Sequence, residues 1–310
     1  MRNAIAACVL AGLSLGAAAE TATLVKQGGA EGPTLEIGLG RMQAESREYV
    51  YRDDGGTLSR LDWKASNVPI LKAGVTYSPN STLTLGLRGW TAITGGDNSM
   101  HDFDWMVPGQ SQWSHRSYSP DTRLHSAYEI DLSATAWLWQ RPTWKLGVVA
   151  GYQQNFFNWT AYGGDFSYWN GARTGSFPAG QPGISYRQTF RLPYVGVAGR
   201  YREQDWEFNA LFKFSPWVAI DDHDTHHLRT LDFTESSRNS RYYGVNLDAG
   251  YYLTPNAKLY AEVSWNKFMQ GRGPTLERNA STGAVNYYGG DAAGMDNKNY
   301  AVTIGVKYRF

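Results

Sequence analysis

The 310-residue chain is 42% hydrophobic, 18% charged and 14% aromatic, a composition that excludes a disordered or collagen-like polypeptide and a bundle of membrane-spanning helices. Its 29 Lys and Arg nearly balance its 28 Asp and Glu, so the formal net charge of +1 gives no reason to expect nucleic acid as a partner. Twenty Tyr, 12 Trp and 12 Phe accompany 34 Gly without long aliphatic runs, and this combination favours β-structure.

The first 19 residues have the organisation of a secretory signal peptide. Arg2 supplies a positive start, residues 4–15 form a short apolar run, and Ala17-Ala18-Ala19 provides a small-residue cleavage site. The run is too short to cross a bilayer as a helix. Cys8 is the only cysteine in the sequence, so a mature chain of residues 20–310 would be exported without disulfide bonds.

Two-residue alternation of apolar and polar side chains predicts β-strands in the remainder of the chain. It is clearest over residues 128–138, and again over residues 300–310, where the chain ends at Phe310. A soluble sandwich would turn the apolar face inward, whereas a membrane barrel would turn it toward lipid. Alternation alone leaves both arrangements open.

The spacing of turns favours the membrane barrel. Short turns are predicted at residues 78–81, 140–143, 202–205 and 254–256. Between them lie polar stretches at about 92–122, 160–186, 220–240 and 268–297, which read as long loops, and a tighter connection at 53–56. Four short and five long connections join ten antiparallel strands, an even number, as bacterial outer-membrane barrels have.

The predicted fold is therefore all-β, a ten-stranded antiparallel transmembrane β-barrel with long extracellular loops. Trp137, Trp139 and Trp144 crowd one short turn, where an aromatic girdle is expected. Strands such as 57–77 exceed the roughly 9 to 11 residues that cross a bilayer, so the barrel should project beyond the membrane on the long-loop side. Ten strands enclose an interior that side chains nearly fill, which makes diffusion through the barrel an unlikely role.

Acidic residues and histidines gather on the long-loop side. Asp102 and Asp104 are two residues apart, as are Asp222, Asp224 and His226, so each set shares one face of an extended segment. An Asp–His pair can make the imidazole a general base, and with no Ser or Cys nucleophile nearby it would activate a water.

Two alternatives remain at this point. The acidic residues could form a solvated loop without catalytic function. They could also hold a divalent transition metal, for which Asp222, Asp224, His226 and His227 are competent ligands.

The same residues resemble the omptins, outer-membrane proteases of Gram-negative bacteria that form ten-stranded barrels. The similar segments occur in family order across nearly the whole mature chain. They are Leu61-Asp62-Trp63-Lys64, Asp102-Phe103-Asp104-Trp105-Met106, Ala150-Gly151-Tyr152-Gln153, Gly175-Ser176-Phe177-Pro178, Leu192-Pro193-Tyr194-Val195-Gly196, Asp222-His223-Asp224-Thr225-His226 and Ala249-Gly250-Tyr251-Tyr252-Leu253-Thr254-Pro255-Asn256-Ala257-Lys258.

The resemblance implies an endopeptidase in the outer membrane, with its active site facing the exterior. Asp224 and His226 would form the dyad that activates water, facing the Asp102–Asp104 pair. Glu48 and Asp222 resemble the acids of the primary specificity pocket, so the expected partners are peptides or proteins with Arg or Lys before the cut. Paired carboxylates can give such a cation charge-assisted hydrogen bonds. The resemblance implies no metal and no organic cofactor.

Two departures from the family pattern affect the expected specificity and the lipid site. His115 stands where omptins often carry an acid that lines the site for the residue after the cut, so a preference for paired basic residues is not expected. At positions that bind lipopolysaccharide in the family, the chain has Gln154, Phe156 and Thr189, which leaves Tyr152 and Arg238 as the candidates. Binding of lipid phosphate is therefore expected to be weaker or to lie elsewhere, while lipopolysaccharide remains the expected outer-membrane lipid partner and activating lipid.

Two other functional classes are compatible with the same barrel. An adhesin-like barrel would hold basic ligands in its acidic loops without cutting them, and a narrow pore would conduct ions. Cleavage of an Arg-containing peptide separates the first alternative from a protease, and conductance across a planar bilayer tests the second.

Overall fold

The computed structural model describes residues 31–310, and the predicted signal peptide lies outside them. All regular structure in residues 31–310 is β. The strands are β1 Glu31–Tyr51, β2 Thr57–Asn80, β3 Leu83–Ala92, β4 Asp97–Asp104, β5 His115–Ser119, β6 Asp121–Gln140, β7 Trp144–Tyr168, β8 Arg173–Glu203, β9 Trp206–His226, β10 Leu231–Tyr252, β11 Ala257–Asn279 and β12 Val285–Arg309. No helix in this part of the chain is long and apolar enough to cross a membrane.

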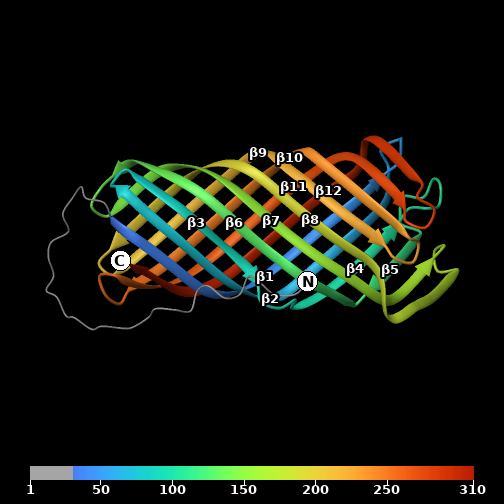
Figure 1. The fold of residues 1–310 in the computed structure, drawn as a ribbon, viewed down its shortest axis with the longest axis horizontal. Coiled ribbons are helices and arrows are strands. Elements are labelled where there is room, and N and C mark those ends of the chain that lie inside the picture. The colour runs from blue at the N-terminus through green and yellow to red at the C-terminus, as the bar shows by residue number, and fades with distance from the viewer. Residues whose placement is uncertain (1–30) are drawn as a thin grey trace.

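The strands form one antiparallel sheet that closes on itself, because β1 pairs with β2 on one side and with β12 on the other (Figure 1). Twelve segments occupy ten positions around this barrel. β3 and β4 pair end to end along β2, and β5 and β6 pair end to end along β7. Pro120, which has no N–H to donate, separates β5 from β6. The predicted ten-stranded barrel is thus confirmed, with two of its strands interrupted.

All four predicted short turns are present, and they lie at the same end of the barrel as the C-terminus (Figure 1). The prediction of long loops at the opposite end is wrong for most of their length. Strands β7 to β12 run through the polar stretches, and only four residues, 169–172, separate β7 from β8. These residues are polar because both of their faces meet water or the groove, and polarity of this kind does not prevent backbone pairing between strands.

The strands are long enough to extend well past a bilayer, as expected. β8 has 31 residues, about three times the number that a tilted membrane strand requires. The end opposite the short turns therefore stands beyond the membrane.

Side chains alternate between an apolar outer face and a polar interior. On β12, Ile304 is 66% exposed on the outside, while the adjacent Thr303 is only 3% exposed on the inside. Trp139 and Trp144 point outward near a short turn, as expected of a girdle. Trp137 does not, because its Nε1 donates a hydrogen bond to Thr84 Oγ1 at 3.0 Å inside the barrel.

The interior is filled in two layers. Toward the short turns, buried ion pairs cross the barrel, such as Lys213 Nζ to Asp131 Oδ2 at 2.8 Å. Toward the projecting end lies an apolar and aromatic layer, in which the Trp63 ring stacks on Tyr186 at 5.4 Å and on Trp159 at 6.0 Å between centroids. This aromatic layer forms the floor beneath the acidic groove described below.

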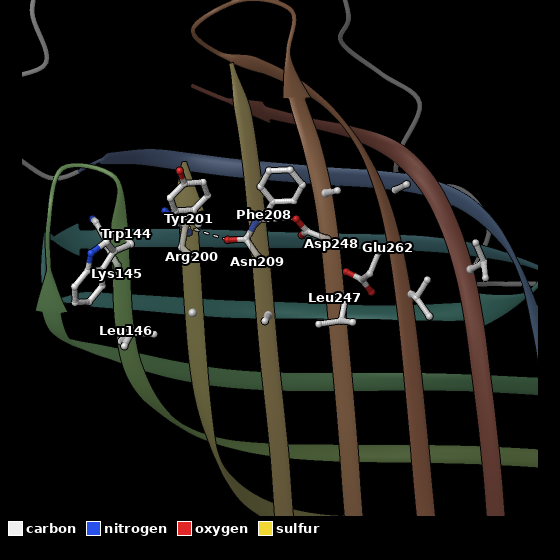
Figure 2. A pocket seen from close by; sticks show the side chains of 16 residues that line it. Trp144, Lys145, Leu146, Arg200, Tyr201, Phe208, Asn209, Leu247, Asp248 and Glu262 are labelled. Atoms are coloured by element: carbon white, nitrogen blue, oxygen red, sulfur yellow. Dashed lines mark hydrogen bonds between the residues drawn. The ribbon is translucent and has the colours of Figure 1, made fainter. Parts of the chain in front are cut away.

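The outer face carries shallow apolar hollows. One of about 740 Å³ lies near the short turns, and Figure 2 shows its lining side chains, among them Leu146 and Leu247, which are exposed on the outside. The hydrogen bond drawn there joins Arg200 Nε on β8 to Asn209 Oδ1 on β9 at 3.2 Å. This hollow lies on the apolar belt and shares no lining residue with the acidic groove described below.

Candidate active site

The Asp224–His226 pair lies at the last residues of β9. His226 Nε2 is 2.6 Å from Asp224 Oδ2, and the carboxylate is 2% exposed. The edge of the His226 ring packs against Phe233 at 5.3 Å between centroids. With one ring nitrogen bonded to the carboxylate, the imidazole is held in one orientation, the arrangement expected of a base and the group that orients it.

Asp102 and Asp104 lie on the inward face of β4, between β2 and β5. Ser59 Oγ donates to Asp102 Oδ1 at 3.4 Å. Burial and the neighbouring Asp104 raise the pKa of Asp102 well above its usual value, and burial also raises the pKa of Asp104. One carboxyl of this pair therefore retains its proton to a higher pH than an isolated aspartate would.

The dyad and the aspartate pair line one groove of about 1240 Å³ at the projecting end of the barrel. They reach it from β9 and β4, which are not neighbours in the sheet. The two sets that were predicted from spacing alone are therefore brought together by closure of the barrel. The groove is open to the exterior.

Glu48 and Asp222 lie deeper, beside the dyad. Both are buried, Glu48 on β1 and Asp222 on β9, and Tyr186 Oη donates to Asp222 Oδ2 at 2.9 Å. Burial and the carboxylates of Asp224, Glu235 and Asp222 raise the pKa of Glu48, and burial is also the main cause that raises the pKa of Asp222 to about 8. A cation entering this pocket would meet carboxyl groups that lack an ionic partner.

His115 is placed differently from the other site residues. It is buried, its Nδ1 lies 2.9 Å from Ser114 Oγ, and its ring packs between Tyr168 at 4.9 Å and Trp169 at 4.6 Å. It does not line the groove, but it pairs directly with Asp104 across β4 and β5. Its closest link to the site is therefore through Asp104.

Arg229 is a groove residue that sequence reasoning missed. It lies in the turn after the dyad, and its Nη2 contacts Nδ1 of His226. Its positive charge also lowers the pKa of Asp102 and Asp104 against the larger effect of burial. The sequence carries one signal for Arg229, which is its position three residues after His226. In the structure, the tight turn there directs the Arg229 side chain toward the dyad.

His227 does not join the other three residues of the alternative metal set. Its Nε2 lies 2.8 Å from Ser185 Oγ. Among residues 31–310, no group of three or more His, Cys, Asp or Glu side chains is arranged to hold a metal ion.

The two predicted lipid-contact residues are on the outer face. Tyr152 is exposed on β7, and Arg238 lies on β10 where the pairing with β9 shifts register. Arg238 Nη2 is 2.7 Å from Asp221 Oδ1, and Arg191 Nη1 is 2.7 Å from Asp221 Oδ2. Arg191, which sequence reasoning did not single out, therefore adds a second cation beside Arg238.

An outward apolar belt, a closed barrel and an external groove with an Asp–His dyad together define the class of outer-membrane β-barrel proteases, and comparison with known proteins agrees. The model of the omptin family matches residues 30–310. The plasminogen activator of Yersinia pestis is 45% identical over 310 residues, covering 100% of this chain and 99% of that protein. Outer membrane protease OmpP of Escherichia coli K12 is 39% identical, covering 91% of each chain.

The fold agrees with a solved structure as well. The crystal structure of outer membrane protease OmpT from Escherichia coli superimposes with a TM-score of 0.86 at 35% identity, covering 90% of this chain and 97% of that one. The chain belongs to the omptin family of outer-membrane proteases.

Proposed function

We propose that the protein is an endopeptidase that cleaves exposed peptides or proteins after Arg or Lys, using a water activated by Asp224 and His226. The observation that carries the proposal is the groove itself, in which this dyad and the Asp102–Asp104 pair share one cavity. His226 bonds to Asp224 through Nε2, so Nδ1 is the nitrogen that takes the proton of the attacking water.

The role of the aspartate pair follows from its protonation. One carboxylate that is ionised and one that keeps its proton can together accept a hydrogen bond from the water and donate one to the oxygen that becomes negative. The pair therefore positions the water and stabilises the tetrahedral intermediate. No metal ion or organic cofactor has a part in this mechanism.

The specificity before the cut is assigned to Glu48 and Asp222. Each is buried without a Lys or Arg partner in the described part of the chain, so an incoming side-chain cation would supply the missing ionic partner. His115 is buried and does not line the groove, so no specificity after the cut is assigned to it.

A peptide library tests the proposal. Purified protein in lipopolysaccharide-containing detergent is given fluorogenic peptides that differ only in the residue before the scissile bond. Cleavage after Arg and Lys, with little after Gln or Glu, supports the assignment. Binding of the basic peptides without turnover would instead support the adhesin-like alternative.

Lipopolysaccharide is proposed as an outer-membrane lipid partner. The support is the pair of exposed cations, Arg191 and Arg238, which share Asp221 on the outer face and could bind lipid phosphate. Tyr152 lies on the neighbouring β7, where its ring could pack against an acyl chain.

A further inference from the structure

A third carboxyl group, that of Glu235, lies beside the pair assigned to substrate specificity. Glu235 on β10 pairs directly with Asp222 on β9 and with Thr275 on β11. Directly paired residues on one face have their Cβ atoms about 5 Å apart, so the side chains of Glu235 and Asp222 are neighbours. Glu235 is 2% exposed, as is Glu48, and Asp222 is 5% exposed.

Each of the three carboxyl groups has one oxygen atom that lacks a hydrogen-bond donor. These atoms are Glu48 Oε2, Asp222 Oδ1 and Glu235 Oε2. The other oxygens of two of the groups are bonded, since Thr275 Oγ1 donates to Glu235 Oε1 at 3.0 Å and Tyr186 donates to Asp222 Oδ2. Within residues 31–310, no Lys or Arg forms an ion pair with any of the three. Buried acceptors of this kind are costly unless something satisfies them.

The two directly paired carboxyls favour retention of a proton in the empty pocket. Burial and the neighbouring Asp222 raise the pKa of Glu235 well above its usual range. A proton retained by one of these carboxyls can be donated to an unpartnered oxygen of the other. Such a proton would occupy the place of a substrate cation.

We propose that Glu235 is a third specificity residue of this pocket, and that the cation of the substrate residue before the cut binds by displacing the proton held between Glu235 and Asp222. This inference rests on the proposed cleavage after Arg or Lys. The proton passes to water, and the N–H donors of the incoming guanidinium or ammonium reach the three unpartnered oxygens. Because the proton and the substrate compete for one site, KM for a basic peptide falls as the pH rises through the range where the pocket ionises.

The test compares Glu235→Gln with Asp232→Asn. Asp232 lies on the same strand, does not line the groove, is partly exposed and accepts a hydrogen bond from Thr225 Oγ1 at 2.7 Å, so it controls for loss of one acidic charge. The probe is a fluorogenic peptide with Arg before the cut, measured between about pH 5 and pH 9. Folding is checked by heat-modifiable mobility on gels.

Glu235→Gln is expected to lower kcat/KM at least about tenfold, mainly through KM, and to flatten the dependence of KM on pH. Asp232→Asn should change neither by more than about twofold. Glu235→Asp, which keeps an ionisable group, should keep the pH dependence of KM. A Glu235→Gln enzyme that matches Asp232→Asn, or a Glu235→Asp enzyme with the flattened profile, would overturn the inference.

The two proposals fail in distinguishable ways. If the wild-type protein does not cleave after Arg or Lys, the proposed function itself is wrong and the role of Glu235 falls with it. If the wild type cleaves there and Glu235→Gln does so equally well at every pH, only the third carboxylate and the displaced proton are wrong.

Discussion

The two ring nitrogens of His226 have different partners, Asp224 at Nε2 and Arg229 at Nδ1. Only the second nitrogen can take a proton from water while the first donates to the carboxylate. In the proposed mechanism, Arg229 therefore has to move away from Nδ1 before His226 can accept the proton of the water.

Removing either member of the dyad should abolish most turnover. His226→Ala and Asp224→Asn are expected to lower kcat by about 10²–10⁴-fold, because proton transfer by a positioned base contributes on this scale. Single-turnover cleavage of an Arg peptide measures the loss, with His223→Ala as the matched control on the same strand, where the ring is bonded to Thr234 away from the groove. A variant of either dyad residue that retains most of the wild-type rate would contradict the assignment.

Arg229 should influence the pH at which kcat/KM falls as the solution is acidified. Its charge favours the ionised forms of Asp102 and Asp104, so Arg229→Gln raises the pKa of both carboxyls further. The ionised carboxylate that the mechanism needs is then lost at a higher pH as the solution is acidified. The acidic limb of the kcat/KM profile should move to higher pH in Arg229→Gln, and a limb that stays in place or moves down would show that Arg229 does not act on this pair.

Chelators should leave activity unchanged, since the proposed mechanism uses no metal ion. The measurement is peptide cleavage before and after EDTA, with lipopolysaccharide supplied in excess because divalent cations bridge its phosphates. Loss of cleavage that zinc alone restores would favour a metal centre instead.

At the scale of the strand, the two-residue alternation of side chains predicted the site better than the assignment of loops did. Two-residue periodicity correctly placed Asp222, Asp224 and His226 on one face, because that rule depends only on an extended backbone. It could not predict Glu235, whose position depends on the register between β9 and β10. The orientation of His115 was equally out of reach, since aromatic residues from the distant end of β7 and its turn enclose it.

Removing one partner of the buried ion pair between Asp131 on β6 and Lys213 on β9 should destabilise the barrel strongly. Lys213→Met leaves Asp131 buried with Arg88 Nη2 at 3.5 Å and the Tyr194 hydroxyl as its remaining partners, which should cost about 3 kcal/mol. Urea unfolding in lipid vesicles measures the change. The double variant Lys213→Met with Asp131→Asn should recover part of it.

The exposed pair between Lys298 and Glu45 serves as the control for that experiment. Its nitrogen and oxygen are 2.9 Å apart, but the lysine side chain is half exposed, so Lys298→Met should cost less than about 1 kcal/mol. Equal losses in the two lysine variants would mean that burial does not set the cost.

In the whole molecule, one barrel carries both the external groove and the outward-facing cations Arg191 and Arg238. Replacing Arg191 and Arg238 together by Gln should weaken binding of lipopolysaccharide and reduce activity at limiting lipid, while excess lipid restores it. Activity titrated against lipopolysaccharide measures the shift. Arg123→Gln, which removes an exposed outer arginine paired with Asp121, is the control, and an equal shift in that variant would argue against a specific lipid site.

Pairing between the first and last strands also determines when the proposed substrate pocket can form. Glu48 on β1 pairs with Met295 on β12, and these two strands come from opposite ends of the described chain. A barrel in which this seam is still unpaired has open edges at β1 and β12, and Glu48 is then not held in a closed wall. The pocket that we assign to Glu48 and Asp222 is therefore complete only in a barrel whose first and last strands have paired.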